Sequence, residues 1–360
     1  MRYSIALFIF IKFSFPVNSQ TADTTNHYSI AIQAHYGFII PHSVEIAPIS
    51  KTKPYSFEIS LSNLKTSYES WSVFNRYNIS GVQFNYFNFQ YPEILGSAYL
   101  LTVFTEPVLS YGDKFRFSIK GGAGLSYHTR FFKYGVNEVN KFFSTRISFP
   151  LYLSARIKYS INENTYLLLS GTYNHISNGA MRIPNYGMNF PTVAVGLEYF
   201  PSKIPQLTKS FSPQVDKKVS NRYILFQVLS GYKVIWGIDT YAFGFSSRYT
   251  WQIRTRYALN AGAELIFDGG MKKLIEIQGL DLDYKRLAIT GGQDFLLGKA
   301  VFSQYLGVYV YSPYKAKHPV YQKYELSYKI VPNIMAGVYL KAHTSDAELF
   351  GFSVNYLINL

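Results

Sequence analysis

The stretch "LYLSARIKYSI", residues 151–161, shows the pattern that decides the fold. Apolar side chains occupy its odd-numbered positions up to residue 159, which are Leu151, Leu153, Ala155, Ile157 and Tyr159. The positions between them are mostly polar, and an alternation of period two is typical of a β-strand with one apolar and one polar face. The stretch therefore predicts a strand that lies between an apolar environment and a wet one.

Similar segments recur along the chain, and they add up to roughly fourteen to sixteen, each of about ten residues, the length that crosses a bilayer when a strand is tilted. A secreted sandwich would bury its apolar faces against each other, whereas an outer-membrane barrel turns them to lipid and keeps a polar lumen. Arg156, Lys158 and Glu198 fall opposite the apolar rows. We therefore expect an all-β, antiparallel transmembrane β-barrel of the outer-membrane type.

The composition excludes several other classes. The 360 residues include no cysteine, so neither a disulfide framework nor a thiolate metal site is possible. The net charge is +14, but the basic residues are scattered singly among 33 Tyr and 29 Phe, which argues against nucleic acid as a partner. His175 has no carboxylate or second histidine at ligand spacing, so we expect no metal and no cofactor.

The two ends of the chain carry export signals. Residues 1–19 are predicted to be a signal peptide, with Arg2 before an apolar centre and Val17 and Ser19 at the small-residue positions before the cut. No later run of about 18 apolar residues predicts a spanning helix. The last strand resembles the segment that the outer-membrane assembly machinery reads, with Leu360 in place of the usual aromatic residue. These features predict a protein of the cell outer membrane.

Residues 201–222 divide the chain, because they contain three prolines and do not alternate. We expect a β-barrel segment over 20–200, a linker over 201–222, and a C-terminal β-barrel segment over 223–360. The C-terminal segment could be a degenerate repeat, since His343 and Ser345 echo an earlier His-x-Ser and would then form a second site. One large barrel is the preferred interpretation, because tandem barrels need a second closure; two smaller barrels are the alternative.

The stretch "NHISNGAMRIPNYGMNF", residues 174–190, carries the candidate chemistry. His175 and Ser177 continue the apolar face of the preceding strand, which predicts that they face outward at the level of the outer leaflet. The connection after them is long and is expected to be extracellular. A histidine and a serine at i and i+2 are close enough for the base to activate the serine.

His-x-Ser-Asn followed by Pro-Asn-x-Gly on a barrel strand resembles the PagL family of outer-membrane lipid A deacylases and the similar acyloxyacyl hydrolases of Bacteroidetes. The resemblance implies a serine esterase in which Ser177 is the nucleophile and His175 the general base. It also implies that Asn185 and the main-chain N–H after Ser177 stabilise the oxyanion. The family's acidic residue, fourteen positions after the histidine, is replaced here by Asn189.

The resemblance further implies that the substrate is lipid A of lipopolysaccharide, from which one ester-linked acyl chain is removed in contact with outer-membrane lipid. The alternative is a non-enzymatic outer-membrane barrel, either a channel or an inactive structural descendant. Its motivation is the missing acid at Asn189 and the water-filled lumen that a barrel of about fourteen or more strands can hold.

Overall fold

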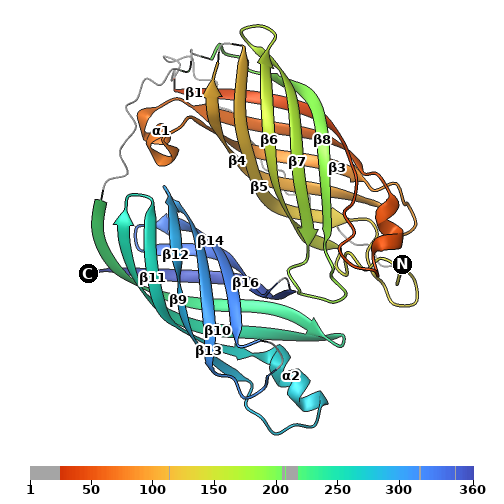
Figure 1. The fold of residues 1–360 in the computed structure, drawn as a ribbon, viewed down its shortest axis with the longest axis vertical. Coiled ribbons are helices and arrows are strands. Elements are labelled where there is room, and N and C mark those ends of the chain that lie inside the picture. Colours follow the sequence, from red (N-terminus) through yellow and green to blue (C-terminus); the bar gives the residue numbers. More distant parts are fainter. Residues whose placement is uncertain (1–24, 113, 205–206, 208–217, 316–317, 345) are drawn as a thin grey trace, which may run out of the picture.

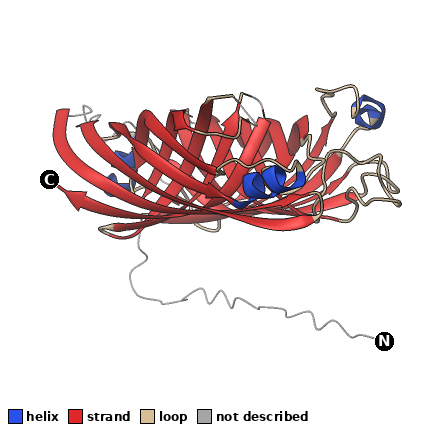
Figure 2. Ribbon diagram, turned by 90° about the horizontal axis from the view of Figure 1, so that it is seen from below, coloured by secondary structure: helices blue, strands red, loops and turns tan. Residues whose placement is uncertain are grey.

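The computed structural model describes residues 25–112, 114–204, 207, 218–315, 318–344 and 346–360. The predicted signal peptide, 1–19, and most of the predicted linker lie outside these residues. The described chain forms two closed antiparallel barrels of eight strands each, which lie side by side in Figure 1. Figure 2 shows that strands make up most of the described structure, together with loops and a few short helices.

The first barrel contains β1 (Asn26–Gly37), β2 (Tyr55–Lys65), β3 (Asn78–Asn88), β4 (Ser97–Tyr111), β5 (Phe115–His128), β6 (Ile147–Ser160), β7 (Thr165–Ser177) and β8 (Met188–Tyr199). The second contains β9 (Lys218–Ile235), β10 (Ile238–Arg254), β11 (Tyr257–Asp268), β12 (Lys285–Leu297), β13 (Ala300–Tyr311), β14 (Val320–Val331), β15 (Ile334–His343) and β16 (Asp346–Asn359). The helices are η1 (Ala47–Lys51), α1 (Tyr68–Phe74) and α2 (Gly269–Ile277). Within the described part of the chain, none of them could span a bilayer.

The all-β antiparallel barrel class and the number of strands are confirmed, but the preference for one large barrel is wrong. The sheet closes after eight strands, because β1 pairs with β8 from Ile30↔Tyr199 to Gly37↔Thr192. A second closure then joins β16 to β9, from Gly351↔Gly231 to Asn359↔Tyr223. The tandem alternative is therefore the one that the structure shows.

Period-two patterning separates the two faces of each wall. In β6 and β7, Leu151, Leu153 and Leu169 point outward and are more than half exposed, whereas Arg156 and Lys158 point into the lumen and are buried. The outward apolar row is the band that an outer-membrane barrel presents to lipid.

The lumen of the first barrel holds paired charges in its middle. Glu106 contacts Arg156 at 2.6 Å and Lys158 at 3.0 Å, and Lys158 also contacts Glu198 at 2.7 Å. Lys120 pairs with Glu58 at 3.1 Å. Pairing of this kind is what makes a buried charge tolerable.

Apolar clusters occupy the lumen on either side of these charges. One contains Phe87, Phe142 and Phe190, and the other contains Trp71 and Phe200. An eight-stranded barrel has an interior that side chains can fill. The wide water-filled lumen on which the channel alternative rested is therefore not what the first barrel has, and that alternative is not favoured.

The two barrels contact each other at both ends. We call the end formed by the turns at 161–164 and 255–256 the turn end, and the end formed by the loops 38–54, 129–146 and 178–187 the loop end. At the turn end, Arg256 Nη2 donates to Asn75 Oδ1 at 2.7 Å and to Ser72 O at 2.8 Å. At the loop end, the rings of Phe149 and Phe350 stack with centroids 4.2 Å apart.

The Glu106→Gln variant should lose stability because it leaves Arg156 and Lys158 with a neutral partner in a buried lumen. Breaking a buried pair in this way costs about 3–5 kcal/mol. The midpoint of urea unfolding in detergent micelles measures the effect.

The matched control is Glu163→Gln, which breaks the exposed pair between Lys203 and Glu163, 2.6 Å apart. It should change the free energy of unfolding by less than about 1 kcal/mol. Equal effects of the two substitutions would show that the lumen charges do not stabilise the barrel.

Candidate active site

His175 and Ser177 lie at the last outward-facing positions of β7, at the loop end of the first barrel. The same face of β7 carries the exposed side chains of Leu169 and Tyr173, while His175 and Ser177 themselves are half-buried. Between them Ile176 points inward and is fully buried in the apolar cluster of the lumen. The period of the strand therefore places the histidine and the serine together on the outer surface.

His175 is paired with Asn189 across the β7–β8 ladder. The two side chains are joined by a hydrogen bond of 2.7 Å between His175 Nδ1 and Asn189 Oδ1. An amide oxygen can only accept, so Nδ1 of His175 carries the proton and Nε2 is left with its lone pair. This tautomer is the one in which a histidine can take a proton from a neighbouring hydroxyl.

A second histidine, His42, extends this chain of contacts. Asn189 Nδ2 donates to His42 Nδ1 at 3.4 Å, and His42 Nε2 donates to the main-chain oxygen of Tyr186 at 2.9 Å. The main chain holds the two segments together, because Ile40 N donates to Asn189 O at 2.8 Å. His42 was not predicted from the sequence: it comes from the loop 38–54, and no local pattern marks it.

Ser177 lies beside His175, and Gly187 approaches both. A Cβ atom at Gly187 would lie 3.1 Å from His175 Cε1 and 3.1 Å from Ser177 Cβ, and the φ angle of Gly187 is +70°. Glycine is therefore suited to this position for space and for backbone conformation. Both side chains are described, and no hydrogen bond joins them; such bonds are often long before substrate binds.

The loop 178–187 folds back so that Asn185 meets the residue after Ser177. The main-chain N–H of Asn178 donates to Asn185 Oδ1 at 3.1 Å. This contact fixes the orientation of the Asn185 amide and turns its NH₂ group away from the Asn178 N–H. The two oxyanion donors that the sequence predicted, Asn185 and the main-chain N–H of Asn178, thus lie next to each other. In this structure, however, the Asn178 N–H donates to Asn185 itself.

Both barrels hold this loop in place. Asn178 Nδ2 donates to Ser144 Oγ at 3.0 Å, and Gly187 N donates to Phe142 O at 3.2 Å, both within the first barrel. From the second barrel, Val234 N donates to Met181 O at 2.7 Å. Contacts on both sides mean that the position of the loop depends on both barrels.

Below the site, the outer wall of the first barrel has two adjoining hollows, each of which is lined in part by β7 and β8. One hollow, of about 450 Å³, is lined by residues that include Tyr36, Phe38 and Tyr173. A second, of about 510 Å³, is lined by Leu169, Ile157 and other apolar side chains. The two share Gly171 and Val193, and a Cβ atom at Gly171 would meet nothing within 4 Å. We call this pair of hollows the wall groove.

A second serine–histidine pair at i and i+2 lies inside the first barrel. Ser126 Oγ and His128 Nε2 are 3.1 Å apart, but both residues are buried in the lumen. The spacing alone is therefore no mark of an accessible site, and the outward face of β7 distinguishes His175 and Ser177.

The echo of the motif near the C-terminus does not reproduce this geometry. His343 is buried in the lumen of the second barrel, where its Nε2 contacts Glu348 at 3.0 Å. Ser345 lies outside the described residues. His343 thus faces the opposite side of its wall from His175.

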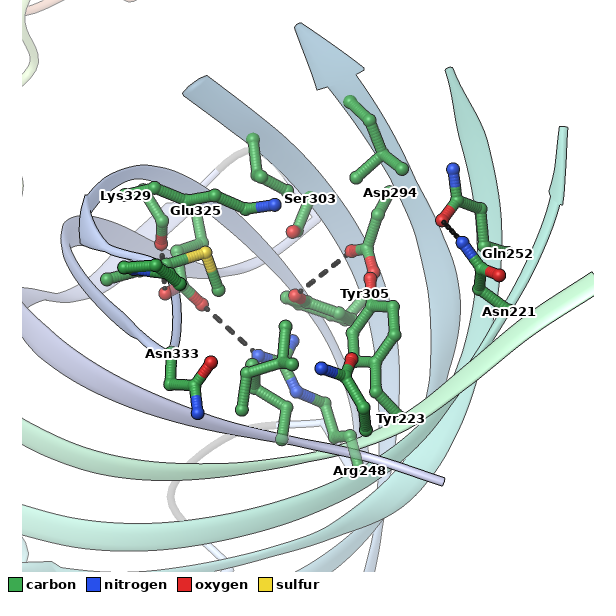
Figure 3. Close-up of a pocket in the computed structure, with 18 residues that line it drawn as sticks. Asn221, Tyr223, Arg248, Gln252, Asp294, Ser303, Tyr305, Glu325, Lys329 and Asn333 are labelled. Atoms are coloured by element: carbon green, nitrogen blue, oxygen red, sulfur yellow. Dashed lines mark hydrogen bonds and ion pairs between the residues drawn. The ribbon is translucent and has the colours of Figure 1, made fainter. Parts of the chain in front are cut away.

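A separate cavity of about 250 Å³ lies at the turn end of the second barrel's lumen (Figure 3). Its lining includes Arg248, whose Nη2 lies 3.9 Å from Glu325 Oε2, and Asp294, which accepts from the Tyr305 hydroxyl at 3.4 Å. Acidic and basic side chains oppose each other there. Since this cavity is in the other barrel and on the lumen side, it is no part of the site at Ser177.

Across the described residues, no group of three His, Asp or Glu side chains is placed to hold a metal ion.

In a comparison with known proteins, each of the two barrels matches a family model. Residues 55–198 match the family model described as lipid A 3-O-deacylase (PagL), and residues 222–360 match that of the acyloxyacyl hydrolase C-terminal domain. No curated protein matches the chain.

Among solved structures, an engineered mutant of the Rh. blastica porin is 10% identical over 92% of this chain and 100% of the porin, with a TM-score of 0.22. A mutant of TodX, a monoaromatic hydrocarbon channel, is 8% identical over 93% of this chain and 89% of that chain, with a TM-score of 0.18. TM-scores this low have no bearing on function. The two family matches, which together span most of both barrels, show that the chain belongs to the PagL family of lipid A 3-O-deacylases, in a form that carries the acyloxyacyl hydrolase C-terminal domain.

Proposed function

We propose that this protein is a serine esterase of the outer membrane that removes an ester-linked acyl chain from lipid A of lipopolysaccharide. Ser177 acts as the nucleophile and His175 as the general base, Asn189 orients His175, and Asn185 stabilises the oxyanion. The observation that supports this most directly is the His175–Asn189 hydrogen bond beside Ser177 on the outward face of β7. Family membership supports the substrate.

The reaction follows from the tautomer of His175. Ser177 Oγ attacks the ester carbonyl carbon while its proton passes to His175 Nε2, and the carbonyl oxygen becomes an oxyanion. The NH₂ group of Asn185 donates to this oxyanion, a contact that can be worth a few kcal/mol. The tetrahedral intermediate then expels the sugar alkoxide, which takes the proton from His175. Water, deprotonated by His175, then attacks the acyl carbon of the ester on Ser177. The Ser177 oxygen leaves and takes the proton back from His175, and the fatty acid is released.

His42 is a positioning residue in this proposal and acts through Asn189. An asparagine side chain can present either its oxygen or its NH₂ group to a neighbour, and only the oxygen holds His175 in the productive tautomer. The hydrogen bond from Asn189 Nδ2 to His42 Nδ1 favours the orientation in which Oδ1 faces His175. In this way a neutral side chain can occupy the position that carries an acid elsewhere in the family.

The wall groove supports a lipid with acyl chains as the substrate. It begins beside the site, since Tyr173 precedes His175 by two residues and Pro191 follows Asn189 by two. Its lining is mainly apolar, and it lies on the face that meets the hydrocarbon of the membrane. An acyl chain lying in the groove would bring its ester to the level of Ser177.

Ser177→Ala and His175→Ala should each reduce deacylation by at least about 10³-fold, because the nucleophile and its base act as one unit. The measurement is the mass of lipid A extracted from cells that lack any other lipid A deacylase and express the variant.

The matched control is Ser126→Ala, which removes the hydroxyl of the buried pair in the lumen and should leave deacylation intact. Heat-modifiable migration on gels should show that all the variant barrels are folded, so that a loss of activity reports on the site. Retention of the activity in Ser177→Ala would refute the proposed mechanism.

His42→Ala should reduce kcat in the wild-type background, because the amide of Asn189 then loses the contact that fixes its orientation. In the Asn189→Asp background the same substitution should have little effect, since either carboxylate oxygen can accept from His175. Asn189→Asp alone should raise kcat or leave it unchanged, while Asn189→Ala should lower it by up to about 10⁴-fold.

The kcat values of purified single and double variants give the coupling between the two positions. Additive effects of His42→Ala and Asn189→Asp would contradict the positioning role of His42. A harmless Asn189→Ala substitution would show that position 189 does not orient His175.

A further inference from the structure

Four basic side chains surround a hollow of about 650 Å³ at the loop end of the first barrel. Arg130, Lys133 and Arg146 come from the loop 129–146, and Arg182 comes from the loop 178–187. Among the described residues that line the hollow, one is acidic, Glu93. We call this hollow the cationic pocket.

These four cations differ from those in the lumen. The lumen residues Lys120 and Arg156 lie within about 3 Å of a carboxylate, as buried charges require. In the described structure none of the four pocket cations takes part in an ion pair. Their positive charge is therefore available to a ligand.

Two of the arginines are held in position by other contacts. Arg130 Nε donates to Pro92 O at 3.3 Å, and the guanidinium of Arg146 lies over the ring of Phe131 at 5.3 Å and that of Tyr127 at 5.7 Å. A guanidinium carries five N–H donors, so most of those on Arg130 are left for another partner. Its fork matches the oxygens of a phosphate.

The cationic pocket is joined to the site through Arg182. The main-chain oxygen of Arg182 accepts from Ser144 Oγ at 2.6 Å and from Asn178 Nδ2 at 2.8 Å. Asn178 is the residue that follows Ser177 and contacts Asn185. A ligand in the pocket thus lies against the loop that carries the proposed oxyanion donor.

We propose that the cationic pocket binds a phosphate group of the headgroup of the lipid whose ester is cleaved. This rests on the proposed function and adds a determinant of substrate specificity to it. Four cations against one acid leave a surplus of three positive charges around the hollow. The wall groove takes acyl chains on the wall below, so the headgroup of the same lipid comes to the level of the loops. A phosphate anchored there would hold the ester beside Ser177.

The test compares two substrates, lipid A with its phosphates and the same lipid A after removal of them by phosphatase, each in neutral detergent micelles. Wild-type protein should favour the phosphorylated lipid in kcat/KM by about 10-fold or more, since a charge-assisted hydrogen bond contributes about that much. The double variant Arg130→Gln/Arg146→Gln should lose this preference through a higher KM, and its kcat/KM for the dephosphorylated lipid should stay at the wild-type value.

Lys51→Gln is the matched control, because Lys51 is exposed in another loop of the same end and does not line the pocket. It should keep the full preference. Loss of the preference in this control, or its persistence in the double variant, would overturn the proposal.

Two further arms identify the source of the phosphate. Inorganic phosphate, added at constant ionic strength, should compete with phosphorylated lipid A in the wild type and not in the double variant; competition that persists in the double variant would overturn the proposal. A non-cleavable phosphorylated lipid should not accelerate cleavage of the dephosphorylated substrate. Acceleration would mean that a neighbouring lipid occupies the pocket, and would also overturn it.

Binding of both lipids to the Ser177→Ala variant separates this proposal from the proposed function. Calorimetry should show tighter binding of the phosphorylated lipid, and the preference should vanish when Arg130→Gln and Arg146→Gln are added. Deacylation that survives in Ser177→Ala would refute the assigned nucleophile but not the pocket. Equal binding of the two lipids would refute the pocket but not the nucleophile.

Discussion

Closure of each eight-stranded sheet on itself is the constraint on which the rest of the structure depends. A chain in hydrocarbon must satisfy every main-chain N–H and C=O group internally, and strands can do so only when the sheet has no open edge. The β1–β8 and β16–β9 ladders provide this closure. Once a strand is in register, each residue is assigned to the lumen or to the outer wall, because a slip of one residue would exchange the two faces. The outward position of His175 and Ser177 follows from this, as does the pairing of His175 with Asn189.

The parts of the fold that depend on local pattern could be predicted from the sequence, and the parts that depend on pairing between distant strands could not. Alternation in residues 151–161 predicts a strand whose faces meet different environments, and Arg156 and Lys158 indeed point into the lumen. The number of barrels could not be predicted, because no local pattern shows that the edge of β8 pairs with β1 before the chain continues to β9. The same limit applies to the site. His175 and Asn189 lie on adjacent strands, whereas His42 arrives from a loop 147 residues away from Asn189.

The second barrel is more than an attached copy of the first. Its His343 faces the lumen, so the echo in sequence does not extend to an outward site. Instead, the barrel supports the loop that follows Ser177. Val234 holds Met181 through the main chain, and a Cβ atom at Gly179 would lie 2.6 Å from Phe350 Cβ, which leaves room for little but glycine there. Because Asn185 and its partner Asn178 belong to this loop, the geometry of the proposed oxyanion donor, Asn185, is linked to the contact between the barrels.

A neutral residue at position 189, where the resemblance to the family implied an acid, suits its surroundings on the outer wall. A carboxylate on the outer wall, near hydrocarbon, would carry a desolvation penalty unless it were paired. The hydrogen-bonded chain from His175 through Asn189 to His42 places neutral groups there instead. Asn189 Oδ1 can only accept, so it fixes which partner donates in each hydrogen bond. In the proposed reaction, the imidazolium formed during attack would have the developing oxyanion as its counter-charge, and the proposed phosphate site in the cationic pocket is separate from it. In this proposal the cations for headgroup recognition lie at the loops, where water and headgroups solvate them, and the chain from His175 through Asn189 to His42 contains no carboxylate.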